Sequence, residues 1–287
     1  MRALLSASLL SVVTLFPGPG NAGARAPQTE VSYGEKGQWT NPNRVTYRGH
    51  FFDLSEIAGR QDFAALADAL QHQLDIVESV NLSPRALTFF RTVPIVVDEM
   101  ACLGSEDPKL QAAACYGPHA PERAQRTPRG ATFWDSESSQ WINADPVSLA
   151  EDTHVGVVMV RPIMLGASSR QAEEPVILHE LLHAYHNKMM PQGVKNPAVL
   201  LHYNLAKSLY PAEAYLLTNE REFFAVTASV FLYGKDGKEP FTRANLKQKQ
   251  PDYFKYLVWL FGFDPDRAPN YGAIAGLIMG SPEFQKR

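Results

Sequence analysis

The stretch VILHELLHAYH, residues 176–186, constrains the fold of this chain more than any other part of the sequence. It places His179 and His183 four residues apart, with Glu180 directly after the first histidine. In an α-helix, residues four apart lie on the same face, so both imidazoles can reach one metal ion. The alternative is that both histidines are ordinary solvated residues of an amphipathic helix. Both interpretations predict a helix, and the first makes that helix the carrier of a metal site.

The residues before this stretch favour a helix start. Glu173 and Glu174 precede Pro175, and proline with acidic residues is typical of a first helical turn. We expect the helix to run to about Met190 and to follow a strand over residues 155–160, which are rich in β-branched side chains. A strand followed by a helix that carries the motif strengthens the metal-site interpretation.

Zinc is the metal that this pattern predicts. Neutral imidazoles of His179 and His183 would supply two ligands, and a third protein ligand with a water would complete an open tetrahedral site for one Zn²⁺ per chain. Glu180 follows the first ligand, so its carboxylate can reach a metal-bound water rather than the metal. We expect it to act as the general base when that water attacks a carbonyl.

The third ligand has to come from elsewhere in the chain. A histidine at position 189 would extend the motif to the metzincin pattern, but the residue is Met189. An acidic residue nineteen positions after the second histidine would fit another peptidase class, but that position holds His202. His186 shares the helix face and lies about 10 Å along the axis from His179. That separation suits a supporting or surface position rather than a shared ion.

Two downstream glutamates, Glu220 and Glu222, are the strongest candidates, and one of them should bind the metal. Asn219 stands three residues before Glu222, which is also the spacing of a capping box, where the glutamate only satisfies the start of a helix. Against the capping role, the residues on the same side of the predicted helix would let it approach the metal helix closely. These residues are Ala225, Val226 and Ser229.

The stretch YLLTNEREFFA, residues 215–225, together with the histidine motif, resembles the gluzincin peptidases related to the catalytic domain of anthrax lethal factor and to the Mlc titration factor peptidase. The resemblance covers about residues 155–232. It implies a zincin-like α+β fold, a peptide or protein substrate, and Glu222 as the third zinc ligand. It also implies that the Tyr215 phenol stabilises the transition state. The other interpretation of Tyr215 is an aromatic core residue within residues 212–217.

The strand before the metal helix has two open interpretations. In folds of this kind it commonly lies along the cleft and pairs with an extended peptide. Residues 155–160 would take that place if they form an edge strand. If they form a buried central strand, no peptide can pair with them.

The remaining periodicity predicts one α+β domain of two lobes, with a mixed sheet and the active-site helix in the N-terminal lobe and a mainly helical C-terminal lobe. Further strands are expected over residues 45–54 and 93–97, and a hairpin over residues 132–144 that carries Trp134 and Trp141. Further helices are expected over residues 62–80, after a cap at Ser83 and Pro84, over residues 219–232 and 253–261, and near residues 272–279. Residues 98–128 are rich in turn-forming residues and predict a surface loop.

The N-terminus has the organisation of a secretory signal peptide. Arg2 precedes an apolar run over residues 3–16, which is shorter than the roughly 20 residues that span a bilayer. We expect cleavage after Ala24, so that residues 1–24 are the signal peptide and residues 25–287 form one two-lobed domain. The expected location is secreted or periplasmic, with no membrane attachment after cleavage.

Charge and cysteine content narrow the partners and the compartment. The net charge of −3 supplies no basic field that would hold nucleic acid or an anionic membrane. Cys102 and Cys115 are the only two cysteines, and in an exported chain such a pair is expected to form a disulfide. Metal ligation by this pair is the alternative, but no CxxC spacing supports it.

Together these features predict a secreted or periplasmic zinc-dependent peptidase of the gluzincin type. The main alternative is a zinc-stabilised binding module of the same fold without turnover. Intact Glu180 and Tyr215 count against a binding module, since a structural zinc site uses four protein ligands and needs no base.

Overall fold

The computed structural model describes residues 45–99, 102, 113–117, 123–127, 130–135, 140–144, 155–166 and 174–267. The expected signal peptide over residues 1–24 and the expected helical segment near residues 272–279 lie outside these residues. None of the helices in the described ranges combines the length and apolar character needed to cross a membrane.

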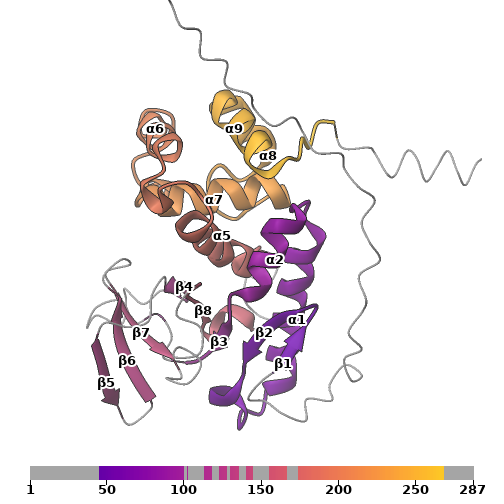
Figure 1. Ribbon diagram of the computed structural model, residues 1–287, viewed down its shortest axis with the longest axis vertical. Helices are drawn as coiled ribbons and strands as arrows, with labels where there is room; N and C mark the ends of the chain where they lie inside the picture. Colours follow the sequence, from indigo (N-terminus) through magenta and orange to yellow (C-terminus); the bar gives the residue numbers. More distant parts are fainter. Residues whose placement is uncertain are drawn as a thin grey trace, which may run out of the picture.

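A five-stranded mixed sheet has the order β1-β2-β3-β8-β4 (Figure 1). Its strands are β1 (Val45–Tyr47), β2 (His50–Asp53), β3 (Ile95–Val97), β8 (Val157–Val160) and β4 (Ala114–Gly117). Strands β2, β3 and β8 run parallel, whereas β1 and β4 are antiparallel to their neighbours. Ile95 faces Val158 on one side of β8, and Cys115 faces Met159 on the other.

The place of β8 decides between the two interpretations of residues 155–160. Both edges of β8 are paired within the sheet, and all four of its side chains are buried. The interpretation as a peptide-binding edge strand is therefore wrong. The edge nearest to this position is β4, which lies in a segment expected to be a loop.

Residues 45–54 form a hairpin instead of the single predicted strand. Arg48 and Gly49 both have positive φ angles, 50° and 84°, and they turn the chain between β1 and β2. Positive φ costs glycine little because it has no Cβ. Alternation of side chains alone does not mark this turn.

Two N-terminal helices pack against the metal helix. They are α1 (Phe63–Ser79) and α2 (Pro84–Thr92), and both confirm the predictions for these residues. Ser83 accepts a hydrogen bond of 3.2 Å from Ala86 N, so it caps α2 as expected. The apolar face of α1 is buried against α5 (Val176–Lys188).

The second half of the described chain is helical, as predicted. Its helices are α6 (Pro197–Ala206), α7 (Glu220–Tyr233), α8 (Arg243–Lys249) and α9 (Pro251–Phe261), and a one-turn 3₁₀ helix, η4 (Tyr215–Leu217), precedes α7. A short helix, α4 (Pro162–Leu165), follows β8. Figure 1 shows α5 and α7 between the five-stranded sheet and the group of α6, α8 and α9.

Residues 98–128 hold more regular structure than the predicted surface loop. Strand β4 lies in this segment, and so does β5 (Arg123–Thr127) of a separate three-stranded sheet. The other two strands of that sheet, β6 (Gly130–Asp135) and β7 (Gln140–Ala144), form the predicted hairpin, with Trp134 paired to Trp141. Pairing of β4 with the distant strand β8 and of β5 with the neighbouring strand β6 holds these short segments extended, despite their turn-rich composition.

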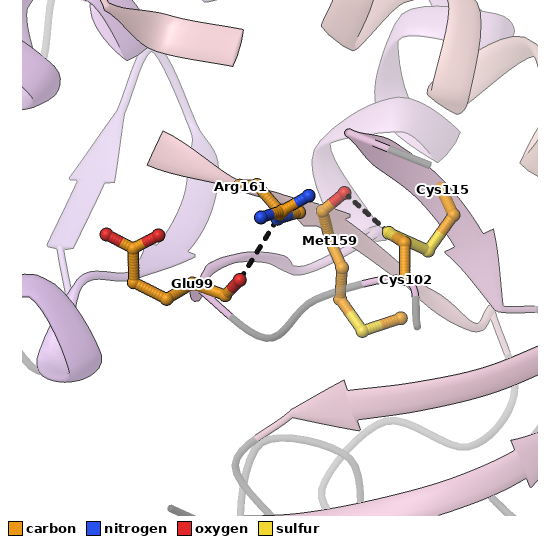
Figure 2. Close-up of a disulfide and its surroundings, with 5 residues drawn as sticks. All are labelled: Glu99, Cys102, Cys115, Met159 and Arg161. Carbon is orange, nitrogen blue, oxygen red and sulfur yellow. Dashed lines mark hydrogen bonds between the residues drawn. A yellow bond between two sulfur atoms is a disulfide. The ribbon is translucent and has the colours of Figure 1, made fainter. Parts of the chain in front are cut away.

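The predicted disulfide between Cys102 and Cys115 is confirmed (Figure 2). It ties the chain that follows β3 to the edge strand β4. Sγ of Cys102 also lies 3.6 Å from the carbonyl oxygen of Met159, a contact only, because a disulfide sulfur has no proton to donate. Arg161 Nε donates to the Glu99 carbonyl at 3.0 Å and fixes the same loop against the end of β8.

Candidate metal centre

Helix α5 carries the HELLH motif through the middle of the molecule. The helix is buried on most sides, because the sheet, α1, α2 and α7 all pack around it. It is therefore not the amphipathic surface helix of the alternative interpretation. His179 and Glu180 are only 7% and 6% exposed, so they are not solvated residues of a helix surface. This burial favours a metal site over the interpretation of the motif as ordinary solvated histidines.

The start of α5 is held by a residue that sequence reasoning missed. Pro175 occupies the capping position and supplies no side-chain hydrogen bond. Gln73 of α1 does this instead, donating from Nε2 to the Glu174 carbonyl at 2.9 Å and accepting from Ile177 N at 3.3 Å. The available signal was a polar residue on the apolar face of the predicted helix over residues 62–80.

Three side chains from two helices converge on one point. Nε2 of His183 lies 3.1 Å from Nε2 of His179. The Glu222 carboxylate lies above them, with Oε2 3.2 Å from Nε2 of His179 and Oε1 3.5 Å from Nε2 of His183. The structure therefore brings together the three residues that the sequence predicted as metal ligands.

Only one of the two downstream glutamates, Glu222, contacts the histidines in the described part of the chain. Asn219 caps α7, since its Oδ1 accepts from the backbone N–H groups of Arg221 and Glu222, both at 2.9 Å. The Glu222 carboxylate faces the histidines and not the helix start. Asn219 therefore caps the helix, but Glu222 does not play the capping role of a capping box. Glu220 forms no ion pair with either histidine among the described residues, and its charge, after burial, raises the pKa of the Tyr203 phenol.

Close packing between α5 and α7 makes this convergence possible. The two helices pack directly against each other. The side chains of Ala225, Val226 and Ser229 are fully buried, as expected for the face of α7 that approaches α5. Short side chains at a helix contact allow a small distance between the axes, and the Glu222 carboxylate can then reach the His179 ring.

The Glu222 carboxylate and the His183 imidazole shift each other's pKa. Burial alone would raise the pKa of Glu222, but His183 and His179 outweigh it and hold that pKa well below the usual range. Burial would lower the pKa of His183, but the Glu222 carboxylate outweighs it and raises that pKa. In the absence of a metal, the contact between Glu222 and His183 thus favours the charged form of each group.

The donor set fits zinc. Two imidazoles and a carboxylate are ligands of catalytic zinc sites, and bonds of about 2.0–2.2 Å in a tetrahedron place neighbouring ligand atoms about 3.3–3.6 Å apart. The three measured separations of 3.1, 3.2 and 3.5 Å are close to this range. In addition, Glu222 Oε2 is buried and has no hydrogen-bond partner among the described residues, as expected of an atom that binds an ion.

Glu180 completes a group of four at the centre. Its carboxylate and the imidazoles of His179 and His183 offer ligand atoms within 4.8 Å of one another. Burial raises the pKa of Glu180, and the charge of Glu222 raises it further, while the two histidines lower it. A carboxylate with a raised pKa is a better proton acceptor, which suits a base.

Tyr215 lies at the rim of the centre and is not a core residue. It is 42% exposed, whereas its neighbour Leu216 is fully buried in the core. Burial, followed by the charges of Glu222 and Glu180, raises the pKa of its phenol. The phenol thus keeps its proton and can donate it in a hydrogen bond beside the two glutamates.

His186 and His202, the other two histidines weighed as ligands, do not join the centre. His186 is fully buried, not on the surface, and its ring stacks on Phe224 with centroids 4.6 Å apart. Burial, with the charges of His183 and Arg221, lowers the pKa of His186 to about 3, so its ring is neutral. His202 stacks on Tyr253 at 4.9 Å, in the packing between α6 and α9.

No protein-family model matches the chain, and no curated protein matches its sequence. A search of solved structures finds similarity to the Pro-Pro endopeptidase PPEP-2 from Paenibacillus alvei. The two chains are 20% identical with a TM-score of 0.38, over 69% of this chain and 91% of that chain. A likeness this distant carries no argument about function, and it supplies no link to lethal factor or to the Mlc titration factor.

Proposed function

We propose that this chain is a zinc-dependent peptidase of the gluzincin type, exported by its N-terminal signal peptide. The observation that carries the proposal is the approach of the Glu222 carboxylate to the imidazoles of His179 and His183, with Glu180 on the same turn of α5. These three ligands would hold one zinc ion and leave a position open for water. When bound, the zinc ion would act as a Lewis acid and lower the pKa of that water.

The protein groups around this position divide the chemistry between them. Glu180 takes the proton of the attacking water and later delivers it to the leaving amine. Tyr215 donates a hydrogen bond to the carbonyl oxygen of the substrate as negative charge develops there. Its raised pKa supports this role, since the phenol stays protonated at neutral pH.

The peptide would pair with the edge strand β4. This strand ends the described sheet order, and it packs against the metal helix α5. An extended peptide can add to such an edge through its main chain, which holds it with little dependence on its side chains. The disulfide to Cys102 keeps Cys115 and its strand in place, and it fits an oxidising compartment outside the cytoplasm.

The alternative is a zinc-stabilised binding module that has no turnover. A structural zinc site is closed by four protein ligands, whereas here Glu180 and Tyr215 stand beside three. Both residues suit a reaction and add nothing to a closed site, so a peptidase is favoured.

The variant Glu180→Gln tests whether the chain is a peptidase or a binding module without turnover. Purified wild type should cleave members of a peptide library, with the products read by mass spectrometry. The variant should keep its zinc and its fold but lose about 10²–10⁴-fold in rate, because a carboxamide cannot accept the proton. The matched control is Glu220→Gln, because Glu220 forms no ion pair with His179 or His183 among the described residues, and it should cleave like wild type.

Two results would contradict the proposal. A zinc-loaded wild type that cleaves no library member would favour the binding module. A Glu180→Gln protein with nearly the wild-type rate would require another base.

A further inference from the structure

The turn between α7 and α8 contacts Glu174 at the start of α5 and the Tyr215 ring, and it has a defined shape. Gly234 ends α7 with a φ angle of 106°, and a β-bridge between Lys235 and Thr242 closes the turn. Inside it, Asp236 N donates to the Phe241 carbonyl at 2.9 Å. These bonds fix the backbone of the turn relative to both helices.

Lys238 extends from this turn towards the centre. Its backbone N–H donates to Asp236 Oδ1 at 2.9 Å, which orients the residue. The neighbouring Gly237 packs against the Glu174 carboxylate at the start of α5 so closely that a Cβ at this position would overlap it. Burial and the charge of Asp236 raise the pKa of Glu174, and the charge of Lys238 partly opposes this, as expected of an ammonium near the start of α5.

The side chain of Lys238 makes its contact with Tyr215. Its Nζ lies 4.4 Å from the centroid of the Tyr215 ring, within the distance at which a cation is attracted to an aromatic face. In the described part of the chain, Lys238 forms no ion pair that would hold its ammonium elsewhere. The Tyr215 ring needs such support, because its residue is 42% exposed on a single 3₁₀ turn.

We propose that Lys238 is a positioning residue, which holds the Tyr215 ring in the orientation that lets its hydroxyl donate to the reacting carbonyl oxygen. The inference rests on the proposed peptidase activity, since the orientation matters only if Tyr215 acts in the reaction. It adds a residue from the α7–α8 turn to a site otherwise built by α5, η4 and α7.

The kinetic test compares three variants. Lys238→Met keeps the aliphatic stem and removes the charge, and it should lower kcat by about 3- to 30-fold, the range expected for a lost cation–π contact. KM and zinc content should hardly change, and Lys238→Arg should restore most of kcat. The matched control is Lys249→Met, because Lys249 also lies 4.4 Å above a tyrosine ring, that of Tyr210, outside the site.

The combination with Tyr215→Phe shows through which residue Lys238 acts. In that background the hydroxyl is absent, so Lys238→Met should cause no further loss of kcat. A loss that persists in the double variant would mean that Lys238 acts through Glu180 or the backbone, and would overturn the inference.

A second readout does not depend on activity. In protein labelled with 3-fluorotyrosine, the fluorine resonance of Tyr215 is identified by its disappearance in Tyr215→Phe. Lys238→Met should shift and narrow this resonance as the ring loses its restraint, and Lys249→Met should leave it unchanged. If the wild type cleaves peptides but Lys238→Met changes neither kcat nor this resonance, the positioning role is wrong while the peptidase stands. If the wild type neither binds zinc nor cleaves peptides, both the positioning role and the proposed peptidase activity are wrong.

Discussion

Oε2 of Glu222 lies 3.2 Å from Nε2 of His179, although the two residues come from different helices. The contact depends on the close packing of α5 and α7, which in turn depends on the short side chains of Ala225 and Ser229. A carboxylate held so near two buried imidazoles would be a costly arrangement if nothing used it, because burying charged groups is expensive. We therefore interpret the contact between Glu222 and His179 as part of a binding site for a metal ion.

Zinc retention should distinguish the two glutamates at the start of α7. Glu222→Ala should release the metal, because it removes the third ligand. Glu220→Ala should retain it, because Glu222 and not Glu220 contacts the histidines in the described part of the chain. Metal content after dialysis against a weak chelator measures the difference. Equal zinc retention in the two variants would favour a capping role for Glu222.

Removal of one hydroxyl should slow the reaction without disturbing the fold. Tyr215→Phe should lower kcat by roughly a hundredfold to a thousandfold, the usual cost of losing one donor to a developing oxyanion. KM, zinc content and thermal unfolding should change little, because the ring and its packing remain. A kcat within a few-fold of wild type would remove Tyr215 from the mechanism.

Parts of the site could be predicted because their signals are local. The spacing of His179 and His183 is enough to place them on one helix face, and Pro175 marks the start of that helix. The residues alone narrow the third ligand to Glu220 or Glu222. The choice of Glu222 and the role of Tyr215 come only through the resemblance, since no spacing rule links two separate helices. The caps at Ser83 and Asn219 follow from the same kind of local chemistry.

The features that the sequence did not predict correctly all depend on contacts between distant segments. Whether β8 is an edge or a central strand depends on the pairing of β4, and composition alone made the segment of β4 a loop. Gln73 and Lys238 act on the centre from other elements, and neither carries a motif. The burial of His186 follows from the packing of Phe224 of α7 over α5, which the periodicity of either helix alone does not show.

Loss of the Gln73 amide should destabilise the protein through the start of α5. Gln73→Met keeps the length of the side chain but leaves Ile177 N–H and the Glu174 carbonyl without this partner. An unsatisfied buried group costs about 1–3 kcal/mol, so the free energy of unfolding in urea should fall by that amount. Gln248→Met, at an exposed position of α8, is the control and should be neutral. A neutral Gln73→Met would show that the capping contact is dispensable.

Acid should weaken the protein at a buried carboxylate far from the metal centre. Glu78 of α1 accepts from Arg91 at 2.7 and 3.0 Å and contacts His50 at 2.9 Å. Burial alone would raise its pKa, but His50 and Arg91 outweigh it and lower that pKa. A group with a lowered pKa in the folded state stabilises above its unfolded value of about 4.3, and this stabilisation is lost as the pH falls through the folded pKa.

The stability gap between wild type and Glu78→Gln measures this contribution. It should be about 1.5–3 kcal/mol near neutral pH, the range for hydrogen bonds to charged groups, and should shrink as the pH falls below about 4.3. Both proteins share the metal centre, so acid release of a metal cancels in the difference. Glu213→Gln, at an exposed position, should show no gap at any pH. A gap for Glu78→Gln that does not depend on pH would mean that packing, not charge, stabilises this contact.

Zinc content of the purified chain tests the central claim most directly. Three protein ligands around one point predict about one zinc per chain in protein purified without chelators, measured by elemental analysis. His183→Ala should lose the metal, and His72→Ala, which changes an exposed histidine of α1, should keep it. A wild-type chain without zinc under these conditions, or a His183→Ala protein that still holds one zinc per chain, would contradict the assignment of His179, His183 and Glu222 as a metal centre.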